Sequence, residues 1–123
     1  MCTFVTTVFD PPIYNVNDNM YYCTLAEAVA ASLTNDGDEL QIPIGIYNEP
    51  CIVVNKSVMT TSVGGSVEIQ CLQMNGVGKV MNLGGDITIN QLTLTNGHFW
   101  TNGKHLKCGT VTGGSATSYV ITD

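Results

Sequence analysis

The chain has 123 residues, of which 44% are hydrophobic, and its ten acids outnumber four lysines, with no arginine. This length suits one domain with a moderate core, and the apolar fraction argues against a disordered chain. The net charge of −6 argues against nucleic acid or an anionic membrane as a partner, because both need clustered cations. No apolar run approaches the roughly 20 residues of a membrane-spanning helix.

The first 23 residues predict a strand followed by a polar loop. Residues 1–9 alternate loosely, as a strand does, and Pro11-Pro12 ends the strand because paired prolines cannot continue a ladder. Asn15-Val-Asn-Asp-Asn19 is then a polar loop. Its oxygens suit calcium, but it lacks the length and the closing glutamate of a calcium loop, so no metal is predicted there.

Residues 24–35 carry the one clear helix signal. Thr24-Leu-Ala-Glu27 is a capping box, in which Thr24 accepts from the Glu27 amide and the Glu27 side chain reaches back. At helical spacing, one apolar face is formed by Leu25, Ala28, Val29 and Leu33. Asn35-Asp-Gly-Asp38 ends the helix, with Gly37 in the left-handed conformation.

Residues 36–123 read as short strands without helices between them. Glycine-containing dipeptides such as Gly64-Gly65 and Asn96-Gly97 separate them, and these dipeptides turn the chain readily. Ile42, Ile44 and Ile46 alternate with other residues, which predicts one buried face for the first strand. Ile87, Ile89, Leu92 and Leu94 alternate in the same way, except that Asn90-Gln91 shifts the alternation by one residue. This shift predicts a corner or bulge. The spacing indicates four or five turns of a coiled sheet, each of roughly one and a half to two dozen residues.

Five cysteines are many for this length, and none is spaced as C-x-x-C. Abundant threonine and asparagine with few cations is typical of an extracellular or cell-surface protein, where disulfides form. A leader would then have been removed. We predict a bridge between Cys23 and Cys51. Cys71 and Cys108 lie within apolar strands and are predicted to be small buried hydrophobic residues.

Three segments together resemble a known family. They are Thr24-Leu-Ala-Glu-Ala-Val-Ala-Ala31, Asp36-Gly-Asp-Glu-Leu-Gln-Ile-Pro-Ile-Gly-Ile-Tyr47 and Ile52-Val-Val-Asn-Lys-Ser-Val58. This combination is similar to the start of a right-handed parallel β-helix of the pectin-lyase-like superfamily, with Pro43 shifted by one position. Residues 92–123 resemble β-helical segments of large secreted bacterial surface proteins. The resemblance implies an all-β fold, a single short solenoid with one N-terminal capping helix.

The superfamily includes lyases and hydrolases, but their chemistry is not evident in this chain. Such lyases use an arginine or lysine base, and here nothing places Lys79, Lys104 or Lys107 beside a calcium site. Such hydrolases cluster aspartates, whereas Asp86 is alone on its strand. Asp36 and Asp38 are explained by the turn. His98, His105 and Cys108 are too few ligands for a structural zinc. No enzyme activity and no catalytic, cofactor or metal residue is therefore predicted.

A parallel coil exposes two sheet ends, and each needs a cover. The helix can cover the first end, and no similar cap follows residues 118–123. Either the chain is a segment of a longer protein, without activity of its own, or another chain covers this end. The preferred hypothesis is a non-enzymatic extracellular structural protein that self-associates end to end, or by addition of its N-terminal strand, into a filament or fibre. Its candidate contacts are Cys2, Phe4, Val5, Val8, Phe9, Tyr119, Val120 and Ile121.

The alternative hypothesis is a carbohydrate-binding or carbohydrate-active β-helix segment of a larger secreted adhesin or enzyme. Phe99 and Trp100 lie between two Asn-Gly turns. Aromatic rings in such a position are the candidate contacts for a polysaccharide, although packing on the coil also explains Trp100.

Overall fold

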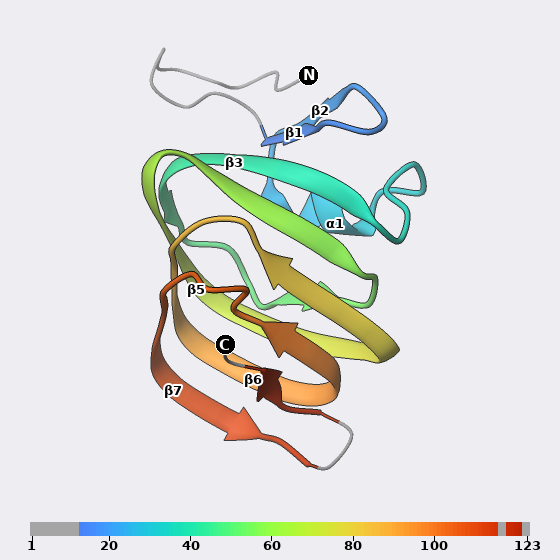
Figure 1. Ribbon diagram of the computed structural model, residues 1–123. Coiled ribbons are helices and arrows are strands. Elements are labelled where there is room, and N and C mark those ends of the chain that lie inside the picture. Colours follow the sequence, from blue (N-terminus) through green and yellow to red (C-terminus); the bar gives the residue numbers. More distant parts are fainter. Residues whose placement is uncertain (1–12, 116–117, 122–123) are drawn as a thin grey trace.

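A computed structural model describes residues 13–115 and 118–121 of the chain, which form a β-solenoid of about four turns (Figure 1). Each turn of the coil is called a rung below. The elements in chain order are β1 (Ile13–Asn15), β2 (Met20–Tyr22), α1 (Leu25–Ala30), β3 (Asp38–Tyr47), β4 (Ile52–Val54), β5 (Val58–Leu83), β6 (Ile87–Trp100), β7 (Leu106–Gly113) and β8 (Val120–Ile121).

The rungs pair in parallel, with β5 on β3 and β4, β6 on β5, and β7 and β8 on β6. Val67 pairs with Ile87 and Leu72 with Leu92, so one turn takes about 20 residues at these positions. This value agrees with the spacing predicted from the sequence. Because the rungs are in register, residues one turn apart stack at the usual strand separation of about 4.8 Å.

The core consists of columns of apolar side chains inside the coil. Ile52, Leu72 and Leu92 form one such column, and each is at most 1% exposed. The long strands β5 and β6 pass around corners of the coil, which is why they pair with more than one other strand (Figure 1). In β6, Asn90 and Gln91 lie outside between two buried rows, which confirms the predicted break in alternation.

Helix α1 begins as predicted but ends early. The Thr24 hydroxyl oxygen accepts from the Glu27 amide at 3.1 Å. The carboxylate that caps the first turn belongs to Glu49, which accepts from the amides of Leu25 (2.8 Å) and Ala26 (3.0 Å). Such a carboxylate satisfies free N–H groups and interacts favourably with the helix dipole.

The predicted helix extended to residue 35, whereas α1 stops at Ala30 because Ala31 adopts extended backbone angles. Leu25, Ala28 and Val29 are buried as predicted, but Leu33 lies beyond the helix and is exposed. The prediction for Leu33 was therefore wrong. Gly37 has a φ of 92°, as the turn after the helix was expected to require. Within residues 13–115 and 118–121, no helix is long and apolar enough for a membrane span.

The first edge of the coil is covered by an antiparallel hairpin of β1 and β2, and β1 pairs with β3. Asn15 was expected in a loop but ends β1 as a buried residue. Its side-chain amide donates to Asp38 at 3.0 Å and to Thr34 at 3.2 Å, which ties the hairpin to the turn before β3. Desolvation and the neighbouring carboxyl of Asp38 raise the pKa of Asp18.

The burial pattern of β3 differs from the one predicted for its isoleucines. Ile42 is buried, but Ile44 and Ile46 are exposed, so the three isoleucines do not share a buried face. The pairing of β3 with β5 shifts register between Pro43 and Gly45. This irregularity exchanges the inner and outer positions of the strand, so that Pro43 is buried and the following isoleucines point outward.

Candidate functional site

The candidate functional surface is the last described rung, which contains β7. No further described rung packs against the apolar side chains of this strand. Strand β7 pairs with β6 and with no other strand among the described residues. Leu106, Cys108 and Val111 are in register with Ile87, Ile89 and Leu92 of β6. They therefore occupy positions that continue the columns filling the coil, in the strand labelled β7 at the bottom of Figure 1.

Exposure along these columns rises sharply at β7. Leu72 and Leu92 are 0% and 1% exposed, whereas Val111, the next residue of the same column, is 53% exposed. Leu106 and Cys108 are half-buried, although Ile87 and Ile89 above them are buried. The apolar side of the last rung is therefore open to solvent over the described residues.

Strand β8 lies beside this surface and contains two of the predicted contact residues. Val120 and Ile121 pair with Phe99 and Trp100 and are half-buried. Tyr119 is exposed at 44%, and its ring lies 4.2 Å from the ring of His98, measured between centroids. Val120 and Ile121 form the last strand that the structure describes, and Tyr119 precedes it; the self-association predicted for these residues stays a prediction.

The remaining predicted contacts, Cys2, Phe4, Val5, Val8 and Phe9, lie outside the described residues. The sequence analysis missed Leu106 and Val111, which contribute most directly to the open end. Their apolar alternation was visible, but only the register with β6 shows that they are in the last rung. Cys108 is a free thiol whose pKa is raised by burial.

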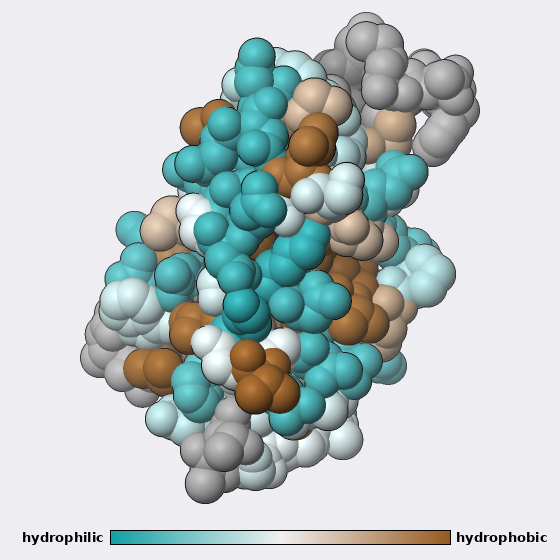
Figure 2. All heavy atoms as spheres, turned by 90° about the vertical axis from the view of Figure 1, so that its right-hand side faces the viewer, coloured by the Kyte–Doolittle hydropathy of each residue, from teal (hydrophilic) through white to brown (hydrophobic). Residues whose placement is uncertain are grey.

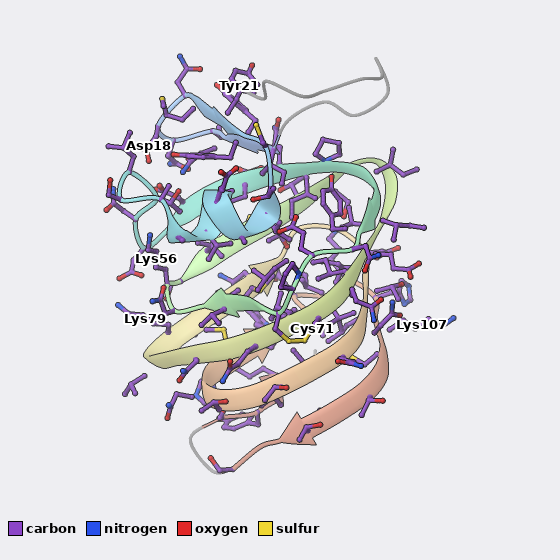
Figure 3. All side chains as sticks on the ribbon, turned by 180° about the vertical axis from the view of Figure 1, so that it is seen from behind. Asp18, Tyr21, Lys56, Cys71, Lys79 and Lys107 are labelled. Carbon is purple, nitrogen blue, oxygen red and sulfur yellow. A yellow bond between two sulfur atoms is a disulfide. The ribbon has the colours of Figure 1, made fainter. Side chains whose placement is uncertain are left out.

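The disulfide prediction was wrong in its pairing. Cys51 is bonded to Cys71, not to Cys23, and Cys71 is therefore not a free buried thiol (Figure 3). The reason is the register of the coil: Ile52 pairs with Leu72, so Cys51 and Cys71 are stacked one turn apart, with their Cα atoms 4.5 Å apart. Stacked cysteines in adjacent parallel strands lie within the separation that a disulfide spans.

The two aromatic candidates for carbohydrate contact lie in different environments. Phe99 is 0% exposed and belongs to the core, so its expected position at the surface was wrong. In β6 the alternation places Phe99 inside and therefore turns Trp100 outward, where it is half-buried. Only Trp100 is positioned to contact a ligand.

Charged residues are dispersed over the surface. Lys79 forms an ion pair with Asp36, and this contact, together with the Ser57 amide, lowers the pKa of Asp36. Lys56 and Lys79 point outward on one side of the coil and Lys107 on the opposite side (Figure 3). No cluster of three or more potential metal ligands occurs among the described residues.

The aspartates considered for hydrolysis have structural contacts. Asp38 is buried and accepts hydrogen bonds from Asn15 and the Asn35 amide, at 3.0 and 2.9 Å. Asp86 accepts from the amide of His105 at 3.0 Å. These contacts fix turns between elements, in agreement with the role predicted for Asp36 and Asp38.

A pocket of about 290 Å³ with a mixed polar and apolar lining lies at a corner of the upper rungs. It includes residues from the hairpin turn, the start of β3 and both ends of β5. Its polar lining consists of Asn17, Glu39, Ser57 and Asn82, and its apolar lining includes Val58 and Met59. Figure 2 shows a band of hydrophilic side chains along the side of the coil that faces right in Figure 1.

Over residues 13–115 and 118–121, these features define a parallel β-solenoid with a hairpin on its first edge, exposed apolar side chains on β7 and a lateral pocket. A search of protein-family models, curated proteins and solved structures found no match to this chain.

Proposed function

We propose that this chain is a non-enzymatic structural protein whose solenoids associate end to end through the open rung of β7 and β8. The observation that carries this proposal is the exposure of Val111, which continues a column whose other members are buried. The same rung presents a backbone edge of β7 that no described strand covers. Exposed strand edges and apolar patches are the features through which β proteins add further strands.

A second copy of the chain is the occupant that we propose for this surface. The edge of β7 has eight residues, enough for several hydrogen bonds to a strand of another copy. Among these residues only Lys107 is charged, so little charge must be desolvated. Tyr119 beside the edge adds an aromatic side chain of the type enriched in interfaces.

We also propose that the protein is extracellular and belongs to the pectin-lyase-like superfamily. Its disulfide supports the first proposal, because such bonds persist in oxidising compartments. The order of capping helix, glycine turn and first rungs supports the second. A contact between unlike ends would extend the assembly into a filament, whereas a contact between two β7 edges would close it as a dimer.

The test is the substitution Val111→Lys in the full chain. A lysine at this position puts a charge where the proposed contact excludes water, so self-association is expected to weaken by at least a factor of about ten (about 1.4 kcal/mol). Sedimentation velocity over a concentration series measures the change, and electron microscopy distinguishes filaments from dimers. Val77→Lys is the matched control, because Val77 is 80% exposed and lies outside β7.

Two results would overturn the proposal. One is a wild-type chain that stays monomeric at its highest soluble concentration. The other is an assembly that Val111→Lys and Val77→Lys affect equally, since this would place the contact elsewhere on the molecule.

A further inference from the structure

The side chain of Glu27 is exposed, and its carboxylate has no ionic or hydrogen-bond partner within residues 13–115 and 118–121. Glu49 occupies the capping position at the start of α1 that the sequence assigned to Glu27. The other described carboxylates each accept a hydrogen bond; they belong to Asp18, Asp36, Asp38, Glu39, Glu49, Glu68 and Asp86. Glu27 is therefore the one unpaired acid of the described chain.

The lysines also differ between the two ends of the coil. Lys56 donates to a carbonyl beside the end of α1 at 2.7 Å, and Lys79 is in the ion pair described above. Lys104 and Lys107 lie just before β7 and in it, and both are exposed. Their ammonium groups have no hydrogen-bond or ionic partner among the described residues. The unpaired charges are thus negative at the first end and positive at the last.

Glu27 borders an open hollow of about 540 Å³ between β2 and α1. Its lining includes Met20, Tyr21, Glu27 and Ala30. Met20 and Tyr21 are 40% and 53% exposed, and the ring of Tyr21 lies 4.6 Å from that of Tyr14, measured between centroids. Apolar and aromatic side chains around one carboxylate suit a partner surface that brings apolar groups together with an ammonium group.

The two ends of the coil also present backbone edges. In the described sheet β2 and β7 are the terminal strands, and each pairs with one other described strand (Figure 1). Contact between two β7 edges would bring the lysines of both copies together. Contact of β7 with the first end of another copy would bring these lysines to Glu27 instead. Because like charges that meet in an interface are costly, the second arrangement is favoured.

We infer that the last rung of one copy docks on the hollow between β2 and α1 of the next copy, with Lys104 or Lys107 facing Glu27. This inference rests on the proposed function, since it names the surface that the β7 edge contacts. Unlike surfaces meet again at every added copy, so the assembly extends as a filament unless its rotation closes a ring. The exposed charges select which end binds, and backbone and apolar contacts supply most of the affinity.

Glu27→Lys in the full chain tests the inference. The substitution brings like charges together at the proposed contact, so self-association measured by sedimentation velocity is expected to weaken by at least a factor of about ten. Asn55→Lys combined with Val77→Lys is the matched control. Both residues are exposed and lie outside β2, α1 and β7, and this control raises the net charge by two, as Glu27→Lys does.

A second variant, Lys104→Glu with Lys107→Glu, reverses the charge of the last rung and is also expected to assemble poorly alone. In an equimolar mixture with the Glu27→Lys chain, every contact between alternating copies joins opposite charges, so assembly is expected to return. A wild-type measurement decides the question if a variant fails to fold. A carbodiimide is expected to link Glu27 of one copy to Lys104 or Lys107 of another, as identified by mass spectrometry.

The inference is overturned if Glu27→Lys assembles as well as its control, if the mixture assembles no better than its components, or if assembled wild-type chains lack this cross-link. In each case, loss of assembly in Val111→Lys would leave the proposed function standing, with a different surface facing the β7 edge. A wild-type chain that stays monomeric would overturn both.

Discussion

Single residues allow adjacent rungs to approach closely. Gly97 has a φ of 89°, which side chains other than glycine rarely adopt. A Cβ atom at this position would also lie closer than 3.0 Å to the carbonyl oxygens of Gly76 and Lys79. Gly97 lies within β6, where the strand packs on β5, and this position requires glycine both for its backbone angle and for the limited space beside β5.

Comparison of Gly97 with Gly78 separates the effect of the backbone angle from the effect of limited space. Gly78 also has a positive φ, of 73°, but a Cβ atom added there would meet no other atom within 4 Å. Gly78→Ala is expected to lower the free energy of unfolding by about 1 kcal/mol through backbone strain alone. Gly97→Ala is expected to cost about 2 kcal/mol more, because the backbone must move away. Urea unfolding measures both variants, and equal losses would show that the close approach is unimportant.

At the scale of elements, the disulfide joins the first two rungs between β4 and β5. Cys51 and Cys71 are 20 residues apart in sequence, and they close one complete turn of the coil. A bridge of this loop length restricts the unfolded chain and is worth about 3 kcal/mol.

Replacing both cysteines with alanine is therefore expected to lower the free energy of unfolding by about 3 kcal/mol. Cys108→Ala is the control, since it removes a half-buried free thiol and is expected to cost less than about 1 kcal/mol. Urea unfolding under oxidising conditions measures the losses. A double variant no less stable than the control would mean that the bridge contributes nothing.

The same elements show which features were predictable from the sequence. The start of α1 and the strands of the coil were predictable because caps, glycine turns and alternation act over a few residues. The pairing of Cys51 with Cys71 and the outward direction of Ile44 and Ile46 were not. Both depend on the register between rungs, which a single strand does not encode.

For the molecule as a whole, the sequence predicted a coil of four or five turns with one short helix near its start, and the structure shows such a coil with about four turns. It did not single out Val111, whose column is known only once β6 and β7 are aligned. The lateral pocket was not predictable, because Asn17 and Asn82 are distant in sequence and line the same pocket only through the winding of the chain.

The charge of the whole molecule governs how copies approach one another. Each copy has a net charge of −6, so copies repel at low ionic strength. The proposed contact is made by backbone edges and apolar side chains, which salt does not screen. Added salt shortens the Debye length to about 10 Å at 0.1 M and weakens the repulsion.

Self-association through β7 is therefore expected to strengthen as sodium chloride is added and as the pH is lowered toward the isoelectric point of about 4.5. Sedimentation velocity at constant protein concentration measures the assembled fraction in each buffer. The Val111→Lys variant, measured in the same series, separates assembly through β7 from precipitation, because precipitation does not require this edge. Assembly that weakens with salt would indicate a contact made by ion pairs, to which β7 contributes only Lys107, and would contradict a contact dominated by apolar side chains and backbone edges.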